Sequence, residues 1–220
     1  MKKVIIFGTG AFAEVAYFYL TEDSNYDVVG FTINKKFITE ENFCGLPVIE
    51  FENIESKYSP TEFSMFIAIG YKNMNKIRAN IFNESKQKGY QLISYINSKA
   101  TVWKNLSIGE NCFILENNVI QPFVKIGNDV ILWSGNHIGH HSTISDHCFI
   151  SSHVVISGFT KINSYSFLGV NSTIRDGVTI ASECLIGAGT LILKNTKKGG
   201  VYTSKDATLL SISSDKLTQI

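Results

Sequence analysis

All five histidines of this 220-residue chain fall within seventeen positions. An imidazole changes charge near neutral pH, so it can act as a general base or as a metal ligand. A zinc site needs three ligands that converge on one ion at about 2.0–2.1 Å. The chemistry available therefore depends on which histidines share a face of the fold. The five are His137, His140, His141, His147 and His153.

A six-residue period determines where these histidines lie. Seventeen consecutive hexads, from Ile96 to Lys197, each open with Ile, Val or Leu, and no residue is inserted between them. This period fits neither a helix nor a plain strand. It predicts a β-solenoid in which each hexad forms one short strand and a corner. The opener and the mostly small fifth residue of each hexad should point inward.

Three of the histidines should lie on different sides of this solenoid. If three hexads complete a triangular coil, residues eighteen apart stack at one strand spacing of about 4.8 Å. His141, His147 and His153 hold the fourth position of successive hexads, so they cannot meet within one subunit. This disfavours a metal site, but a site at a seam between subunits stays open, as does a metal-dependent lyase or hydratase.

His140 holds a third position and should point out of the prism. Eighteen residues further on stands Gly158, which offers a backbone N–H without a side chain in the way. Acyl transfer from a thioester needs a base that takes the nucleophile's proton and an N–H that stabilises the oxyanion. We therefore predict that His140 and Gly158 are catalytic; the alternative is a plain surface histidine. His137 would line the acceptor side, and His147 and His153 suit an interface or solvent.

Polar and sulfur-containing residues also occupy inward positions. Asn118 and Asn136 lie one coil apart and should bond each other or nearby backbone. Cys112, Cys148 and Cys184 are 36 residues apart, so they would share a column at about 10 Å, beyond disulfide reach. We expect them to be core residues in a reducing cytoplasm.

The first third of the chain alternates strands with helices, which predicts a small parallel α/β unit. Gly8, Gly10 and Ala13 match G-x-G-x-x-A, a loop that can hold an anion at a helix N-terminus. NAD is disfavoured because the second strand ends at Asn34 without a carboxylate. The remaining interpretations are that the loop binds a phosphate or a sugar nucleotide, or that its glycines only permit a tightly packed turn. The expected strands span 3–8, 26–33, 63–70 and 91–96, and the helices 11–20 and 74–88.

Composition excludes several classes of protein. The net charge is +1, and positive and negative residues are scattered along the chain, so the sequence predicts no basic patch for binding nucleic acid. No stretch of about 18 apolar residues predicts a membrane span, and the first residues resemble a strand and turn rather than a signal peptide. We expect a cytoplasmic protein of two modest domains.

Three segments add a resemblance to a known family. They are residues 139–144 (GHHSTI), residues 167–172 (FLGVNS), and residues 187–189 (GAG) followed by Lys194-Asn195. With the early Gly-x-Gly loop, they make nearly the whole chain resemble the bacterial sugar acyltransferases that include the sialic acid O-acetyltransferases and the bacillosamine N-acetyltransferases. The resemblance implies a left-handed parallel β-helix, a homotrimer, and acetyl-CoA bound without metal between adjacent coils.

The resemblance also assigns residues. It places the family's catalytic histidine on His140 and its oxyanion-hole glycine on Gly158. The residues expected to contact acetyl-CoA are Gly158, Gly169, Ala188 and Gly189. The candidate substrate contacts are Gly8, Gly10, Phe12, Asn34, Asn136 and His137.

The chain departs from the family's pattern at several positions. Phe12 replaces a histidine that commonly contacts the sugar donor's phosphates, and Asn34 replaces an acidic residue, so the acceptor is expected to differ or to be held differently. Residues 204–207 replace the usual Gly-x-Pro-Ala at the CoA end. His141 stands where an acid usually follows the catalytic histidine, which leaves Asp146 as a candidate to orient His140.

The sequence thus predicts a Rossmann-like substrate-binding domain (1–94), a β-helix acyltransferase domain (95–198) and a C-terminal tail (199–220). The predicted function is acetyl transfer from acetyl-CoA to an amino or hydroxyl group of a sugar, with a nucleotide-linked amino sugar used for surface glycans as the expected acceptor. One alternative is O-acetylation of sialic acid or another polysaccharide. Another is a solenoid binding protein without catalysis.

Overall fold

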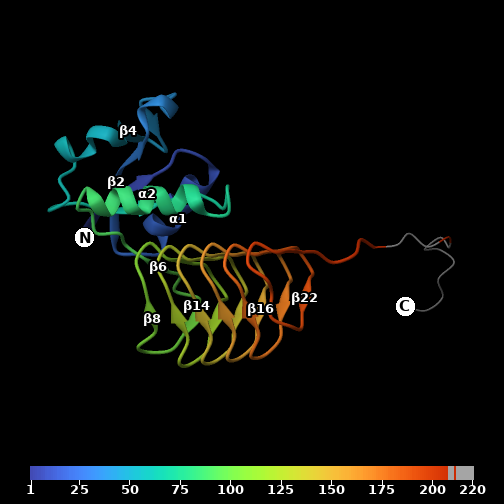
Figure 1. Cartoon of the computed structure of the whole chain (residues 1–220). Coiled ribbons are helices and arrows are strands. Elements are labelled where there is room, and N and C mark those ends of the chain that lie inside the picture. Colours follow the sequence, from blue (N-terminus) through green and yellow to red (C-terminus); the bar gives the residue numbers. More distant parts are fainter. Residues whose placement is uncertain (208–210, 212–220) are drawn as a thin grey trace.

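The structure, a computed structural model, describes residues 1–207 and 211. An α/β domain comes first and a triangular coil of short strands follows it (Figure 1). Residues 208–210 and 212–220 of the expected C-terminal tail lie outside the described residues. No helix among the residues described is long and apolar enough to cross a membrane.

The α/β domain is built on one five-stranded sheet with the order β3-β4-β2-β1-β5, parallel except for the β3–β4 pair. Side chains alternate along the apolar β1, so α1 covers one face of the sheet and α2 the other. The elements are β1 (Lys2–Phe7), α1 (Ala11–Glu22), β2 (Tyr26–Ile33), η1 (Lys35–Phe37), β3 (Asn42–Phe43), β4 (Leu46–Glu50), η2 (Phe51–Ser56), β5 (Ser64–Ile67) and α2 (Lys76–Gln87).

Most of the elements predicted in this domain are confirmed. The strand at 26–33 appears with the predicted ends, the helices and the strands at 3–8 and 63–70 appear with shifted ends, and β3 and β4 were not predicted. The prediction of one strand over 91–96 is wrong, because Leu92 makes only an isolated bridge to Met65 and the coil begins at β6.

The coil is a left-handed parallel β-helix of two-residue strands, and each strand from β6 to β22 ends in a hexad opener. Strands three apart in the chain pair in register, so Ile120 lies beside Ile138 and Ile138 beside Ile156, which confirms the eighteen-residue coil. The strands are β6 (Tyr95–Ile96), β7 (Thr101–Val102), β8 (Ser107–Ile108), β9 (Phe113–Ile114), β10 (Val119–Ile120), β11 (Lys125–Ile126), β12 (Ile131–Leu132), β13 (His137–Ile138), β14 (Thr143–Ile144), β15 (Phe149–Ile150), β16 (Val155–Ile156), β17 (Lys161–Ile162), β18 (Phe167–Leu168), β19 (Thr173–Ile174), β20 (Thr179–Ile180), β21 (Leu185–Ile186), β22 (Leu191–Ile192) and β23 (Val201–Tyr202).

The interior follows the predicted hexad pattern except at its first coil. Openers from Ile114 to Ile192 are buried, whereas Val102 and Ile108 are partly buried and Ile96, on the first rung, is 37% exposed. Asn118 donates to the carbonyls of Leu115 and Trp133, as the predicted polar ladder requires. The three coil cysteines are free and buried, and burial raises the pKa of the Cys112 and Cys148 thiols to about 12.

Three corners join the sides of the prism, and the fourth residue of the hexad turns each corner with a positive φ. Corner A lies between the β13 and β14 sides, corner B between β14 and β15, and corner C between β12 and β13. The corner residues are Asn105, Phe123, His141, Phe159 and Gly177 at A; Asn111, Asp129, His147, Tyr165 and Glu183 at B; and Asn117, Gly135, His153, Asn171 and Gly189 at C.

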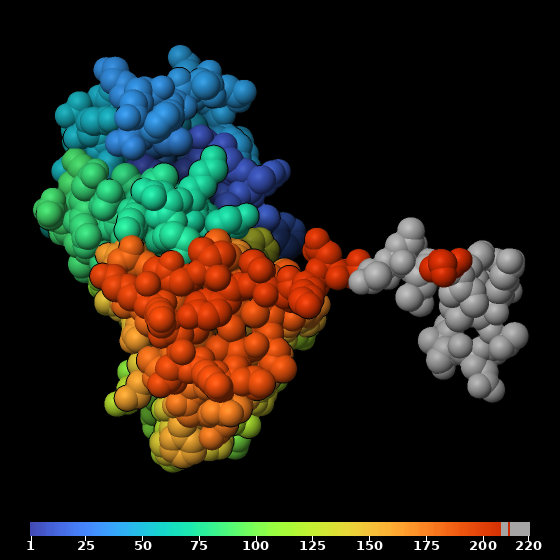
Figure 2. All heavy atoms as spheres, turned by 45° about the vertical axis from the view of Figure 1, so that its right-hand side comes forward, coloured from blue at the N-terminus to red at the C-terminus, as the bar shows by residue number. Residues whose placement is uncertain are grey.

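The α/β domain is seated on the side that contains β9, β12 and β15 (Figures 1 and 2). Phe113, Ile131 and Phe149 project outward there and share one apolar core with residues of α1 and β5. Corner B borders this side and meets α2, whereas corner A is the corner opposite to it. The two domains therefore form one packed unit that leaves corner A uncovered by its own α/β domain.

Candidate active site

The structure brings His140 and Gly158 together at corner A, as their spacing predicts. A Cβ placed on Gly158 would lie 3.0 Å from Cε1 and 3.1 Å from Nε2 of His140. The imidazole is exposed and Gly158 is buried beneath it. The missing side chain of Gly158 thus leaves a notch with Nε2 of His140 at its wall.

The Gly158 N–H lies at the edge of this notch, against Gly139, and is unpaired among the described residues. The backbone hydrogen bonds between successive coils involve other groups near this N–H. The Phe159 N–H donates to the His140 carbonyl at 2.9 Å, and the Gly177 N–H donates to the Gly158 carbonyl at 2.9 Å. Among residues 1–207 and 211, the Gly158 N–H has no acceptor. A fixed, unpaired N–H is what stabilisation of a developing oxyanion requires.

Three contacts orient His140. Its backbone N–H donates to Oε1 of Gln121 at 2.9 Å, and the edge of Phe159 meets its ring with centroids 5.0 Å apart. Its Nδ1 lies 3.1 Å from Nδ1 of His141. The expectation that Asp146 orients this ring is wrong, because its Oδ1 accepts from the Asn128 N–H on a different side of the coil.

Sequence reasoning missed Asp176, which lies on the far side of the notch. Its Oδ1 is 3.1 Å from the position that a Cβ on Gly158 would take, the same distance as His140 Nε2. The signal was present, because Asp176 follows Gly158 by one eighteen-residue coil. The notch therefore has an imidazole on one side and a carboxylate on the other.

The residues expected to hold acetyl-CoA lie at two corners. Gly169, Ala188 and Gly189 are at corner C, where a Cβ on Gly169 would approach the Ala188 nitrogen to 2.6 Å. The Gly169 and Gly189 N–H groups already donate to the carbonyls of Ile186 and Val170. The Ala188 N–H has no acceptor within the described part of the chain. One chain therefore does not bring these three residues to His140.

Four of the predicted substrate contacts line one cavity of the α/β domain. Gly8, Gly10, Phe12 and Asn34 surround a volume of about 430 Å³, together with apolar side chains and Lys72. Gly8 has a φ of +126°, and a Cβ there would meet the Ala68 carbonyl at 2.9 Å, so this turn requires glycine.

The other two predicted substrate contacts lie on the coil. The prediction for Asn136 is wrong, because its side chain is enclosed in the prism and bonds the Trp133 carbonyl and the Val154 N–H. His137 lies on β13, away from the α/β cavity, and is partly exposed. Trp133 packs against Phe12 of the same chain, with ring centroids 5.9 Å apart.

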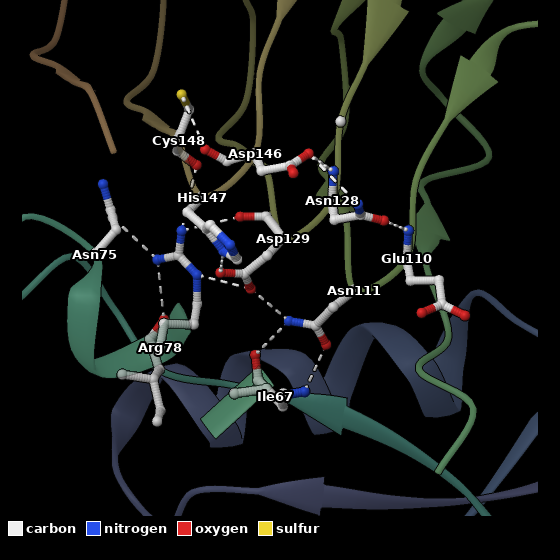
Figure 3. Close-up of polar contacts among 12 residues, drawn as sticks. Ile67, Asn75, Arg78, Glu110, Asn111, Asn128, Asp129, Asp146, His147 and Cys148 are labelled. Carbon is white, nitrogen blue, oxygen red and sulfur yellow. Dashed lines mark hydrogen bonds and ion pairs between the residues drawn. The ribbon is translucent and has the colours of Figure 1, made fainter. Parts of the chain in front are cut away.

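A buried polar cluster at corner B ties the cavity to the coil (Figure 3). The Arg78 side chain is fully buried, and its Nε donates to Oδ1 of Asp129 at 3.0 Å. Its Nη1 donates to the carbonyls of Ile69 and Gly70, which belong to the cavity wall. Nδ1 of His147 lies 2.8 Å from Oδ2 of Asp129. His147 is therefore an interface residue between the domains.

Only part of this cluster could have been predicted from the sequence. Asp129 and His147 are eighteen residues apart at fourth positions, so their contact could have been predicted from the coil register. Arg78 lies on a helix of the other domain, and no local pattern indicates that its charge is buried. Within the described ranges, no group of three or more His, Cys, Asp or Glu side chains is arranged to hold a metal ion.

Two sequence profiles match the chain. Residues 3–85 match the PglD N-terminal domain, and residues 105–140 and 123–158 match the bacterial transferase hexapeptide (six repeats). The search of curated proteins gave no match.

Several solved structures share the whole architecture. The acetyltransferase domain of PglB from Neisseria gonorrhoeae is 25% identical, with a TM-score of 0.80 over 96% of this chain and 100% of that domain. A variant of perosamine N-acetyltransferase from Caulobacter crescentus is 21% identical, with a TM-score of 0.79 over 92% of this chain and 93% of that one. WeeI from Acinetobacter baumannii is 17% identical, with a TM-score of 0.78 over 90% and 94% of the two chains.

The order of domains, the profiles and the shared architecture confirm the resemblance inferred from the sequence. The chain therefore belongs to the bacterial sugar acetyltransferase family, in which a PglD-type domain precedes a hexapeptide-repeat coil, and it is an acyltransferase.

Proposed function

We propose that this protein transfers the acetyl group of acetyl-CoA to an amino or hydroxyl group of a sugar, without a metal, and with His140 as the general base. The observation that supports it most is the notch at corner A. There, Nε2 of an exposed imidazole lies beside Gly158, whose N–H is unpaired within the described part of the chain. A related structure, the PglB acetyltransferase domain from Neisseria gonorrhoeae, holds acetyl-CoA.

The proposed reaction is a direct displacement. The acceptor heteroatom attacks the thioester carbonyl carbon while its proton moves to Nε2 of His140. The carbonyl electrons shift onto oxygen, and the Gly158 N–H donates to this oxyanion. The carbonyl then re-forms, the C–S bond breaks, and the CoA thiolate takes the proton from Nε2. The products are the acetylated sugar and CoA thiol, and His140 is neutral again.

We further propose that the working enzyme is a homotrimer. The α/β cavity and corner A lie on opposite sides of one chain, and Ala188 lies at corner C. A second copy beside the first, with its coil parallel, can supply corner C and its α/β cavity to the His140 of its neighbour. Gly158 of one copy and Gly169, Ala188 and Gly189 of the next would then flank one acetyl-CoA. Sedimentation should give a trimer.

For the acceptor we propose a nucleotide-linked amino sugar, made in the cytoplasm for a surface glycan. The perosamine N-acetyltransferase holds CoA and GDP-perosamine, and it shares this fold. In this chain the equivalent domain has a cavity of about 430 Å³ with Lys72 at its wall, a cation suited to a phosphate. The domain limits predicted at 94/95 and 198/199 are part of this proposal.

A second candidate is O-acetylation of sialic acid or another polysaccharide. Phe12 favours it, because its ring packs on Phe113 and Trp133 where the family commonly presents a histidine to the phosphates. Asn34 also lacks a carboxylate, and its amide donates to Glu52. Both features make the cavity less suited to a nucleotide.

One assay separates these candidates. Release of CoA thiol from acetyl-CoA is measured with amino sugars, nucleotide-linked amino sugars and sialic acids. Turnover should be fastest with one nucleotide-linked amino sugar; a preference for sialic acid would favour the second candidate. Calorimetry with acetyl-CoA tests the remaining alternative, since a binding protein without catalysis should bind none and release none.

A further inference from the structure

We propose that His141 is the positioning residue for His140, and that it works as a neutral imidazole where the family has an acid. In this proposal Nδ1 of His141 accepts a hydrogen bond from Nδ1–H of His140. This leaves Nε2 of His140 unprotonated and facing the Gly158 notch. The inference rests on the proposed function, because it concerns the base of that reaction.

The distance between the two rings means that their hydrogen bond must have a definite direction. The two Nδ1 atoms are 3.1 Å apart, so one must donate and the other accept. If His140 donates, its Nε2 carries a lone pair and can take the acceptor's proton. If His141 donates, neutral His140 carries its proton on Nε2 and cannot act as a base. The direction of one hydrogen bond therefore decides whether the site is competent.

Neighbouring rings fix His141 in place. It lies between Phe123, with centroids 4.7 Å apart, and Phe159, with centroids 4.9 Å apart and planes 17° from parallel. Phe159 also meets the ring of His140. Phe123 is 72% and Phe159 53% exposed, so this aromatic column stands at the surface beside the notch. The two phenylalanine rings hold the His141 ring in place and bring no charge next to it.

No charged side chain competes for His141. The nearest rungs carry Asp176 on the far side of Gly158, and Lys125 and Lys161 on the strands that flank Thr143. Within the described part of the chain, none of these three forms a hydrogen bond or ion pair with His141. His140 is thus its polar partner. When His140 becomes an imidazolium, its Nδ1–H still donates, and the bond becomes charge-assisted.

This arrangement differs from a carboxylate in one respect. A carboxylate can only accept, so it enforces the competent direction at any pH where it is ionised. An imidazole accepts only while it is neutral. Protonation of His141 would reverse the bond and block the base, so the pair is competent only when both rings are uncharged.

The first test compares His141→Phe with His141→Glu. Phe123 and Phe159 already adopt the same left-handed backbone at this corner, with φ of 67° and 56°, and Glu183 does so at corner B with 63°. Both variants should therefore fold. H141F should lower kcat about tenfold to a hundredfold with unchanged acetyl-CoA affinity, since a misplaced base costs about that much. H141E should restore most of the lost kcat, because its carboxylate accepts the same bond.

The matched control is Tyr165→Phe, at the same hexad position with φ of 62° but at corner B, away from the proposed acetyl-CoA groove. It should keep kcat within twofold of the wild-type value. A kcat within twofold of wild type for H141F would overturn the positioning role. If His140→Ala is inactive in the same assay, the proposed function survives that result; if both variants retain turnover, the proposed function fails as well.

The second test does not depend on turnover. In the ¹⁵N-histidine spectrum of the full-length protein, His140 should carry its proton on Nδ1 at the pH of activity and keep Nε2 unprotonated. In H141F this preference should weaken. A wild-type spectrum with the proton on Nε2 of His140 would contradict the proposed direction of the bond.

Discussion

His141 and His147 hold the same position in successive hexads and share a φ of 59°, but their surroundings differ completely. His141 stands at corner A between two exposed aromatic rings, with His140 as its polar partner. His147 stands at corner B, nearly buried, with Asp129 as its partner and Phe82 against its ring. The repeat fixes the backbone of a corner, and the neighbouring domain determines its chemistry.

This contrast divides the molecule into a corner that supports the structure and a corner that presents reactive groups. At corner B the polar groups bond one another: Asp129 accepts from both Arg78 and Asn111. At corner A, Nε2 of His140 and the Gly158 N–H lie beside a notch and have no acceptor or donor among the described residues. Substitutions at B should therefore change stability, and substitutions at A should change turnover.

The largest effect should come from Arg78→Met. The substitution removes the cation of a fully buried ion pair, so the Asp129 carboxylate stays buried without its charged partner, and the carbonyls of Asp129 and Cys148 lose the Arg78 donor. Breaking such a pair costs about 3–5 kcal/mol of the free energy of unfolding. Urea unfolding followed by circular dichroism measures it.

The matched control for this prediction is Lys76→Ala on the same helix. Lys76 pairs with Glu183 at 2.7 Å, but both side chains are substantially exposed, so the loss should stay within about 1 kcal/mol. Equal effects of the two substitutions would show that corner B is not the structural anchor described above.

Gly158→Ala should have a smaller effect in free energy, and this effect should appear in turnover rather than in stability. The added Cβ would stand 3.0 Å from the His140 ring, which is tighter than an ordinary contact, so the imidazole must shift. The ring is exposed and can move, so the fold should be stable, but kcat should fall about tenfold or more. Steady-state kinetics with a parallel unfolding curve checks both parts. A drop in stability with normal kcat per folded molecule would contradict the division between the corners.

The smallest effect concerns the contact between α1 and the start of the coil. Asp23 accepts hydrogen bonds from the Ser98 N–H and the Tyr95 hydroxyl, and these bonds lower the pKa of its carboxyl. A carboxyl with a lowered folded-state pKa adds stability above its unfolded pKa of about 3.9 and loses it as pH falls through the folded value. Asp23→Asn should therefore be slightly less stable than wild type at pH 7.

The same reasoning fixes the pH at which this difference disappears. The difference should begin to shrink near the unfolded pKa of about 3.9, and the two unfolding curves should converge only below the lowered folded-state pKa, where the wild-type carboxyl is protonated in both states. A difference that stays constant from pH 7 to acid pH would show that the charge of Asp23 does not stabilise this contact.

The coil could be predicted almost completely from the sequence, because its pattern is local and repeated. The spacing of openers gave the register, and the register brought His140 over Gly158 and would have revealed Asp176 as well. Ile96 deviated because a terminal rung lacks a neighbour on one side. The prediction of Asn136 as a substrate contact was wrong because the fifth position of every hexad points into the prism.

The contacts between domains could not be predicted in the same way. Arg78 and Asp129 are 51 residues apart in the sequence, and their meeting depends on which side of the prism the α/β domain covers. Trp133 packs on Phe12 of the other domain, and nothing local in the sequence indicates this contact. β3 and β4 were missed because they are short and carry Pro47 and Gly45 between weakly patterned residues.

The most direct test of the account is the turnover of His140→Ala. The acceptor found in the thiol-release panel is used at saturation, and acetyl-CoA affinity is measured on the same preparation. We expect kcat to fall at least a hundredfold, as for a lost general base, with affinity and oligomeric state unchanged. Turnover within a few-fold of wild type would contradict the assignment of His140 as the base.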